Sequence, residues 1–163
     1  MPIGSRTIRL EIASAIDMLD LVQLVTDHVG KAAGLNDEEV HWFGMAVREC
    51  VTNAIVHGKC DSSRAVSIEF ASTPAAKPSK LTVRVRDQGQ GFDPNQLPDP
   101  LAPENILRTS GRGIFLMRQF MDDVSIKRTS GGGMEVRMTK RIRPGQPEAK
   151  SARRKAGREP RRP

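Results

Sequence analysis

The sequence has 163 residues, of which 37% are hydrophobic and 28% charged, and this composition suits one domain with one core. No run approaches the roughly 18 apolar residues that a membrane-spanning helix needs. Residues 1–10 also lack the apolar segment of a secretory signal, so we expect a cytoplasmic protein without disulfides. The two cysteines and three histidines show no metal-ligand spacing, which argues against a structural zinc site.

The net charge of +7 is concentrated at one end of the chain. Residues 140–163 contain 10 Lys and Arg against 2 Asp and Glu, whereas the remainder of the chain has a net charge of −1. We therefore expect a folded domain over residues 1–142 and a basic, disordered tail over residues 143–163. Contact of this tail with nucleic acid is an alternative that the near-neutral domain does not favour.

The first elements predicted are a strand and a helix. In residues 6–12 apolar side chains alternate with polar ones, which is typical of a half-buried strand. Over residues 14–29 apolar side chains recur every three or four positions, which predicts an amphipathic helix. Glycine favours helix ends, so this helix is expected to end near Gly30 or Gly34.

A longer helix is predicted next. Asn36 and Glu39 have the spacing of a capping box, in which each side chain accepts a hydrogen bond from the other residue's backbone N–H. Apolar residues then recur at helical spacing as far as His57, and Gly58 would end the helix.

The second half of the chain predicts four strands and one short helix, with a long Gly-, Pro- and Asp-rich connection over residues 88–111. These elements are strands at 66–70 and 81–85, a helix at 114–121, and strands at 124–127 and 134–139. The order of elements predicts an α+β fold, a two-layer sandwich with helices on one face of a mixed, mostly antiparallel sheet.

Three polar residues in the long helix recur every fourth position. Glu49, Asn53 and His57 would therefore lie along one side of it. Taken alone, this stripe fits the solvent face of an amphipathic helix as well as it fits a binding site.

A carboxylate and two glycines follow the strand at 81–85. Asp87 could accept a hydrogen bond from an exocyclic amine such as that of adenine, and Gly89 and Gly91 would let the backbone approach a flat base. An ordinary turn has the same composition, so this pattern alone leaves both interpretations open.

A second glycine pair precedes the helix at 114–121. Gly111, Arg112 and Gly113 lie where free backbone N–H groups and the helix dipole can hold phosphate oxygens. The segment matches neither the Walker A loop nor the dinucleotide fingerprint, since it lacks their Lys-Ser/Thr pair and third glycine.

The three motifs together identify a family. In this order and spacing, ECVTNAIVHG, RVRDQGQGF and SGRGIFLMRQFMDDV resemble the ATP-binding domain of gyrase, the Hsp90 chaperone, histidine kinases and MutL, the GHKL superfamily with its Bergerat fold. The phrases VTNAIVHG and GIFLMRQFMDDV are most similar to the bacterial anti-sigma factor serine/threonine kinases. The resemblance covers residues 6–140, nearly everything except the tail.

This resemblance implies a role for each motif residue. Glu49 matches the general base, Asn53 the ligand of Mg²⁺ on the phosphates, and Asp87 the adenine-reading aspartate. The remaining matches are Gly89 and Gly91 along the base, Gly111, Arg112 and Gly113 at the phosphates, and residues 92–110 as the lid.

One position departs from the pattern of the family. Many relatives have a threonine after the last glycine pair, where it supports the adenine-binding aspartate, but here Met134 follows Gly132 and Gly133. The missing hydroxyl predicts weaker ATP binding unless Thr139 or a water takes its place.

The implied function is an anti-sigma factor serine/threonine kinase. Such a protein would bind Mg·ATP, form a homodimer, sequester a sigma factor, and phosphorylate an anti-anti-sigma partner with a STAS domain. Two alternatives remain open from the sequence. One is a nucleotide-binding regulator that sequesters a partner without phosphoryl transfer, and the other gives the main role to the basic tail, which would tether the domain to nucleic acid or to an acidic partner.

Overall fold

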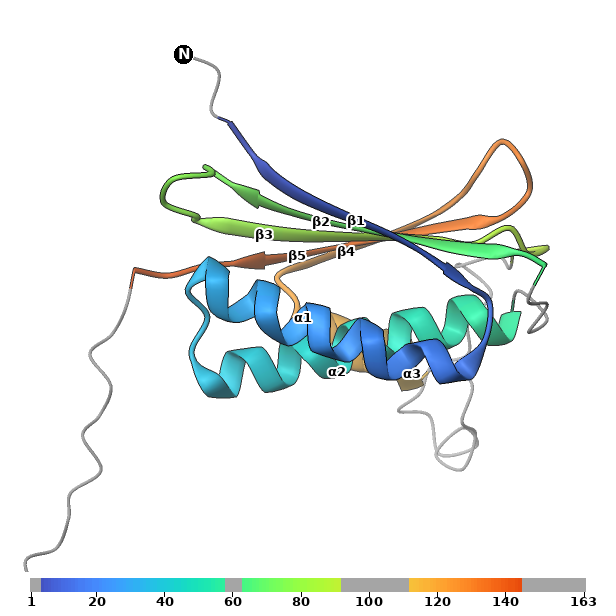
Figure 1. Ribbon diagram of the computed structural model, residues 1–163, viewed down its shortest axis with the longest axis horizontal. Helices are drawn as coiled ribbons and strands as arrows, with labels where there is room; N and C mark the ends of the chain where they lie inside the picture. The colour runs from blue at the N-terminus through green and yellow to red at the C-terminus, as the bar shows by residue number, and fades with distance from the viewer. Residues whose placement is uncertain (1–3, 58–62, 92–111, 145–163) are drawn as a thin grey trace, which may run out of the picture.

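The computed structural model describes residues 4–57, 63–91 and 112–144 (Figure 1). In chain order its elements are β1 (Arg6–Ala13), the short 3-10 helix η1 (Ile16–Met18), α1 (Leu19–Ala33), α2 (Asp37–His57), β2 (Ala65–Thr73), β3 (Lys80–Arg86), α3 (Arg112–Phe120), β4 (Asp123–Arg128) and β5 (Met134–Arg141). Every strand and helix that the sequence predicts is present. The strands are slightly longer than predicted, because backbone pairing continues beyond the alternating apolar residues.

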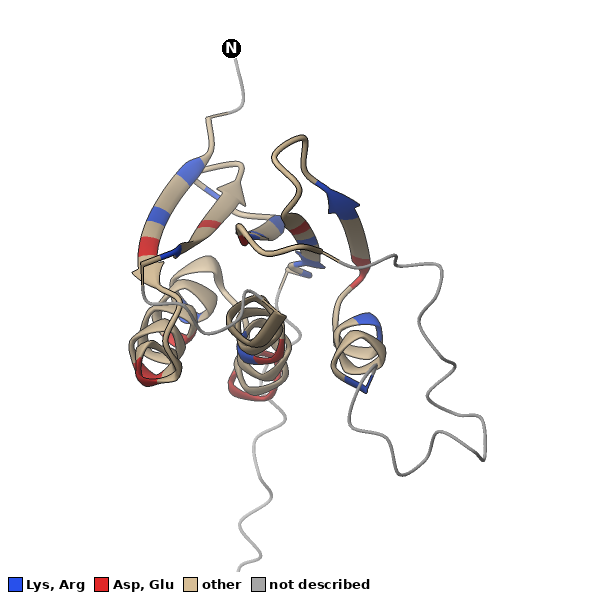
Figure 2. Cartoon of the chain, turned by 90° about the vertical axis from the view of Figure 1, so that its right-hand side faces the viewer, with Lys and Arg blue, Asp and Glu red and all other residues tan. Residues whose placement is uncertain are grey.

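The five strands form one sheet with the order β1-β2-β3-β5-β4. Each described pair of neighbours is antiparallel, so the mixed component allowed by the prediction is not found among the described strands. All three helices lie on one face of the sheet, and the other face is open (Figures 1 and 2). The α+β two-layer sandwich is therefore confirmed.

The core lies between the sheet and α2. Alternate residues of the central strands, such as Ile68 on β2 and Val83 on β3, are fully buried on the helix side. From the opposite layer, Phe43, Val47 and Val51 of α2 are buried against them. Because α2 also contacts both α1 and α3, it is the middle helix of the layer, and its C-terminal half is held rigidly over the sheet.

The connection between α1 and α2 follows the predicted turn chemistry. Gly34 ends α1 in the left-handed conformation, with φ of 100°. The Glu39 amide then donates to Asn36 Oδ1 at 2.8 Å, and the Asn36 amide donates to Glu39 Oε2 at 3.0 Å. The capping box is thus confirmed at the start of α2, whereas the predicted stop at Gly58 lies outside the described residues.

The open face of the sheet carries a cross-strand network of ion pairs. Glu69 accepts from Arg9 Nε at 2.7 Å and from Arg84 at 3.2 Å, and Glu135 pairs with Arg84 and Arg86. The hydrogen bond from Arg9 lowers the pKa of Glu69, and the charges of Arg9, Arg84 and Arg86 act in the same direction against a smaller effect of burial. This face is therefore covered by charged side chains rather than by a second helix layer.

The last described residues stay attached to the sheet after β5 ends. The Ile142 amide donates to the Ser79 carbonyl at 2.8 Å, and its side chain is buried. The tail beyond Pro144 lies outside the described residues, so its disorder and the domain boundary at 142 stay predictions. Among the described residues, no helix has the length and apolar character that crossing a membrane requires.

Candidate active site

The C-terminal half of α2 turns its polar stripe toward a pocket. Asn53 and His57 line this pocket, Glu49 is half-buried one turn before Asn53, and His57 is exposed as the last residue of the helix. Because two members of the stripe line a pocket and the third is half-buried, the stripe is not simply the solvent face of α2. The helical spacing therefore predicted correctly which residues come together.

The start of α3 packs directly against this stripe. Gly113 is buried, and a Cβ atom placed on it would lie 3.0 Å from Glu49 Oε2 and 3.1 Å from Asn53 Nδ2. A Cβ atom here would require Glu49 or Asn53 to shift by a few tenths of an ångström, so the packing is tight. The segment predicted to bind phosphate and the two polar residues of α2 therefore meet at one place.

Asp87 lies on the opposite wall of the pocket, immediately after β3. Its Oδ1 atom accepts a hydrogen bond from the Gly89 amide at 2.9 Å and one from the Met134 amide at 3.3 Å. The Asp87 amide in turn donates to the Met134 carbonyl at 3.0 Å. The carboxylate is thus held by main-chain groups on both sides, and its position beside the pocket is well defined.

The two glycines after Asp87, Gly89 and Gly91, are not among the residues that line the pocket. Gly89 is buried and contributes its amide to Asp87. Gly91 has a positive φ of 69°, and a Cβ atom there would lie 2.8 Å from Met134 Sδ. Both glycines therefore shape the loop that supports Asp87, and their predicted contact with a base remains untested.

The pocket is mostly apolar and lies between α2, α3, β3 and β5. Its open volume among the described residues is only about 20 Å³, and its polar groups are few. The lining residues are Cys50, Asn53, Ala54, His57, Val85, Asp87, Ile114, Met117, Met134 and Val136.

Most apolar members of this lining were not singled out by the sequence analysis. Met117 is buried in the core and also lines the pocket. Its spacing of four residues from Gly113 is the signal that could have placed it on the same face of α3. Val85 carries a similar signal, because it lies near the end of β3, two residues before Asp87.

Cys50 is fully buried in the pocket wall. Burial raises the pKa of its thiol, and the nearby charge of Asp87 raises it further. Cys50 therefore stays a neutral thiol and acts as a small apolar side chain.

Thr139 does not replace the missing hydroxyl beside Asp87. It lies five residues beyond Met134 on β5, which corresponds to about 16 Å along a strand. Its hydroxyl instead lies 3.4 Å from that of Thr82 on the open face of the sheet. The suggestion that Thr139 supports Asp87 is therefore wrong, because the register of β5 carries it to the other end of the sheet.

Part of the predicted phosphate side lies outside the described residues. Gly111 and the predicted lid at 92–110 belong to this part, whereas Arg112 is the exposed first residue of α3. Arg112 and Gly113 thus stand at the N-terminus of a helix of nine residues, where backbone N–H groups can donate hydrogen bonds to the oxygens of an anion.

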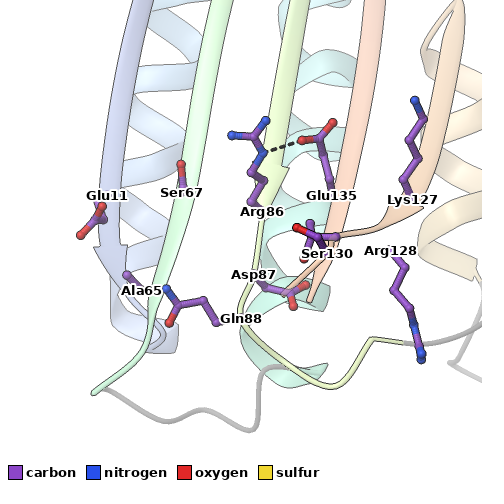
Figure 3. Close-up of a pocket in the computed structure, with 11 residues that line it drawn as sticks. Glu11, Ala65, Ser67, Arg86, Asp87, Gln88, Lys127, Arg128, Ser130 and Glu135 are labelled. Atoms are coloured by element: carbon purple, nitrogen blue, oxygen red, sulfur yellow. Dashed lines mark hydrogen bonds and ion pairs between the residues drawn. The ribbon is translucent and has the colours of Figure 1, made fainter. Parts of the chain in front are cut away.

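A wider hollow of about 570 Å³ lies on the open face of the sheet (Figure 3). Its lining is polar and charged, and Figure 3 shows Arg86 pointing toward Glu135 across it. Asp87 borders both cavities, but Glu49 and Asn53 line no part of the larger one, because they belong to the helix layer. Of the polar residues singled out in the sequence, Asn53, His57 and Asp87 line the smaller pocket.

The described residues suit a Mg²⁺ ion that arrives with a nucleotide. They contain no group of three His, Cys, Asp or Glu that could hold a metal ion by itself. Asn53 is half-buried beside Gly113 and offers one neutral oxygen. One protein oxygen suffices where phosphates and water supply the other ligands, so this donor set fits a phosphate-bound ion.

Comparison with known proteins agrees with this arrangement. Residues 12–140 match the family described as Histidine kinase-like ATPase domain. Proteins named Serine-protein kinase RsbW from Staphylococcus aureus strains JH9 and Newman are 28% identical to this chain over 144 residues, which covers 83% of this chain and 87% of each relative.

One solved structure has a similar fold. The RsbU and RsbW domains of Rv1364c from Mycobacterium tuberculosis match with a TM-score of 0.62 at 17% identity. The match covers 86% of this chain, and this chain spans only 34% of that one. The likeness therefore shows the fold of the whole described domain.

Proposed function

Because the chain belongs to the family of histidine kinase-like ATPase domains, we propose that it is an ATP-dependent serine/threonine protein kinase that acts as an anti-sigma factor. In this proposal it sequesters a sigma factor and phosphorylates an anti-anti-sigma protein with a STAS domain. Its similarity to two serine-protein kinases named RsbW over most of both chains supports this choice within the family.

The observation that carries the proposal is the meeting of α2 and α3. Glu49 and Asn53 of α2 both lie beside Gly113 of α3, where a Cβ atom would be 3.0 Å from Glu49 Oε2 and 3.1 Å from Asn53 Nδ2. Phosphoryl transfer needs little more than a positioned base, a metal ligand and a phosphate cradle. Such a triad at the edge of an apolar pocket favours a kinase over a simple binding module.

Glu49 is the general base in the proposed reaction. The hydroxyl oxygen of a partner serine or threonine attacks the γ-phosphorus of ATP, the bond from that phosphorus to the bridging oxygen breaks, and ADP leaves. Glu49 accepts the proton of the attacking hydroxyl. Its half-buried position beside Gly113 holds the carboxylate at the phosphate side rather than in open solvent.

The other site residues orient the nucleotide. Asp87 accepts a hydrogen bond from the exocyclic amine of adenine, while Gly89 and Gly91 form the loop beside the base. The γ-phosphate end lies at the N-terminus of α3, where Arg112, Gly113 and the preceding Gly111 offer backbone N–H groups and a positive charge.

Asn53 is the protein ligand for Mg²⁺ in this proposal. When bound, the ion would offset the negative charge of the phosphates. Asn53 would contribute its neutral amide oxygen from a side chain whose Nδ2 atom lies beside Gly113 at the start of α3.

We propose that the protein acts in the cytoplasm, because anti-sigma factors must meet sigma factors there. We also propose that it is a homodimer, on the basis of its resemblance to the anti-sigma factor kinases. Sedimentation of the full-length chain at micromolar concentration tests the dimer. A monomer with full kinase activity would remove the dimer from the proposal without affecting the active site.

The direct test is phosphorylation of a candidate partner. The full-length protein is incubated with Mg·[γ-³²P]ATP and anti-anti-sigma proteins encoded in the same genome. Glu49→Gln removes the base with little change of shape. Glu38→Gln is the matched control, because it makes the same change at an exposed position of the same helix.

Label on a serine or threonine of one partner, lost in Glu49→Gln and kept in Glu38→Gln, is the expected result. Absence of label from every partner, with ATP binding and partner association both demonstrated, would contradict the kinase and favour the sequestering regulator. The absence of a side-chain hydroxyl at Met134 is the observation that keeps this second function in view.

A further inference from the structure

The carboxylate of Asp87 is held in an unsymmetrical way. Both of its hydrogen bonds within the described residues fall on Oδ1, one from the Gly89 amide at 2.9 Å and one from the Met134 amide at 3.3 Å. No hydrogen bond or ion pair within the described residues falls on Oδ2. A carboxylate oxygen has room for about two donors, so Oδ1 is saturated and Oδ2 is the acceptor that remains for a ligand.

This arrangement depends on the residue that precedes Met134. A Cβ atom on Gly133 would lie only 2.0 Å from the carbonyl oxygen of Asp87 and 2.9 Å from its carbonyl carbon. The clash is with main chain, so rotation of a side chain cannot relieve it. Only glycine therefore lets β5 begin close enough for the Met134 amide to reach Asp87.

The other side of Gly133 is also fixed. Its carbonyl accepts from the Thr129 amide at 2.8 Å, and the Gly132 amide donates to the Thr129 carbonyl at 3.0 Å. Gly133 is thus held between the β4–β5 hairpin and the end of β3. A shift of the backbone at this position would move the Met134 amide away from Asp87.

The side chain of Met134 has a different role from its amide. It is 2% exposed and lines the pocket, with its sulfur close to Gly91. A thioether offers no useful donor for a carboxylate. The side chain therefore contributes an apolar wall, while the backbone supplies the hydrogen bond.

We propose that Gly133 is a positioning residue for nucleotide selection. By admitting the Met134 amide to Oδ1 of Asp87, it leaves one acceptor, Oδ2, which selects a purine with a single exocyclic amine at position 6. The inference rests on the proposed function, because it assumes that the pocket holds the base of ATP. Guanine carries a carbonyl oxygen at position 6 and offers Oδ2 no donor there, so GTP is disfavoured by the same arrangement.

Base selectivity measures this role separately from general stability. The dissociation constants of Mg·ATP and of Mg·purine riboside triphosphate, which lacks only the 6-amino group, are determined for the full-length protein by calorimetry. We expect the wild-type protein to bind ATP at least about tenfold more tightly, since one hydrogen bond to a charged acceptor is lost.

The key variant is Gly133→Ala, and its control lies in the same hairpin. A Cβ atom on Gly131 meets nothing within 4 Å, so Gly131→Ala should keep the wild-type selectivity. Gly133→Ala should reduce the ratio of the two dissociation constants, and so the preference for ATP, to about twofold or less. Its dissociation constant for the purine analogue should stay within about threefold of the wild-type value. Retention of the wild-type preference in a folded Gly133→Ala protein would overturn the proposal.

Met134→Ala tests the same idea if Gly133→Ala does not fold. It removes the apolar wall and keeps the amide, so both dissociation constants should rise together with their ratio within about twofold of wild type. If the two dissociation constants became equal in Met134→Ala, the Met134 side chain would be responsible for selecting the base, and the proposal would be rejected. Equal binding of both nucleotides by the wild-type protein would also reject it, whereas binding of neither would count against the proposed function itself.

Discussion

Gly113 of α3 lies against the carboxylate of Glu49 on α2, so closely that a Cβ atom would stand 3.0 Å from Glu49 Oε2. Glycine inside a helix is a poor choice for stability, because alanine favours a helix by about 0.5–1 kcal/mol. The contact with Glu49 gives a reason for it at this position.

We expect Gly113→Ala to separate stability from catalysis. The added methyl group should push the flexible Glu49 side chain aside and slow phosphoryl transfer at least about tenfold, while the melting temperature stays level or rises. Transfer rates and thermal melts of the variant and of Arg118→Ala, an exposed change on the same helix, would check this. Full activity in a stable Gly113→Ala protein would show that the spacing at Glu49 is not required.

The fold could be predicted from the sequence because its signals are local. Alternation of apolar residues indicates the strands, and the capping pair Asn36 and Glu39 marks the start of α2. The same helical period placed Glu49 and Asn53 together. These features depend on neighbours along one element, and the structure confirms them.

The support of Asp87 could not be predicted in the same way. Its hydrogen bond comes from the backbone of Met134, which is 47 positions away along the chain, and residue types carry no information about a main-chain donor. Only the register of β3 and β5, with Arg86 opposite Glu135, brings the two together. The sequence shows that a hydroxyl is missing at Met134 and suggests Thr139 as its replacement, because residue types carry information about side-chain donors only.

Asp87→Asn should change which base is preferred. If Oδ1 of the new amide keeps its two main-chain donors, the NH₂ group takes the place of Oδ2 and faces the adenine amine with a second donor. ATP should then bind about 10- to 100-fold more weakly, which is the expected range for a lost hydrogen bond to a charged group. The affinity of the variant for inosine triphosphate, which has an oxygen at position 6, should fall much less. Calorimetry with both nucleotides and with Asp123→Asn as an exposed control would test this, and equal losses for both would contradict it.

Mg²⁺ should bind measurably only together with nucleotide. The described residues hold no cluster of three metal-binding side chains, and Asn53 offers a single oxygen. Thermal melts should therefore show no stabilisation by Mg²⁺ alone and a clear rise with Mg²⁺ and ATP combined. Removal of the metal by EDTA should abolish transfer. A shift of the melting temperature by Mg²⁺ alone would point to a metal site that Asn53 does not explain.

The ion pairs of the open sheet face should stabilise the protein in a pH-dependent way. The pKa of Glu69 in the folded protein lies below its usual value of 4.5, chiefly because of the hydrogen bond from Arg9. Its contribution is therefore present at pH above about 4.5 and is lost as the pH falls through the lowered pKa. Glu69→Gln should lower the free energy of unfolding at pH 7 by less than about 1 kcal/mol, since the network is partly exposed. Urea unfolding at pH 7 and pH 3 should show the difference shrinking at pH 3, and an equal difference at both would refute this.

Removal of the basic tail should leave the nucleotide site intact. Within the described residues, the Ile142 amide donates to the Ser79 carbonyl, and the residues that line the pocket end at Val136. A chain that ends at Pro144 should therefore bind ATP with an unchanged dissociation constant and keep its association with a protein partner.

The full-length chain and the truncated chain are compared in ATP calorimetry and in DNA binding at 50 and 200 mM salt. DNA binding that is strong at low salt, falls steeply with salt and disappears on truncation would assign nucleic-acid contact to the tail. Loss of ATP binding on truncation would instead show that the tail contributes to the kinase domain.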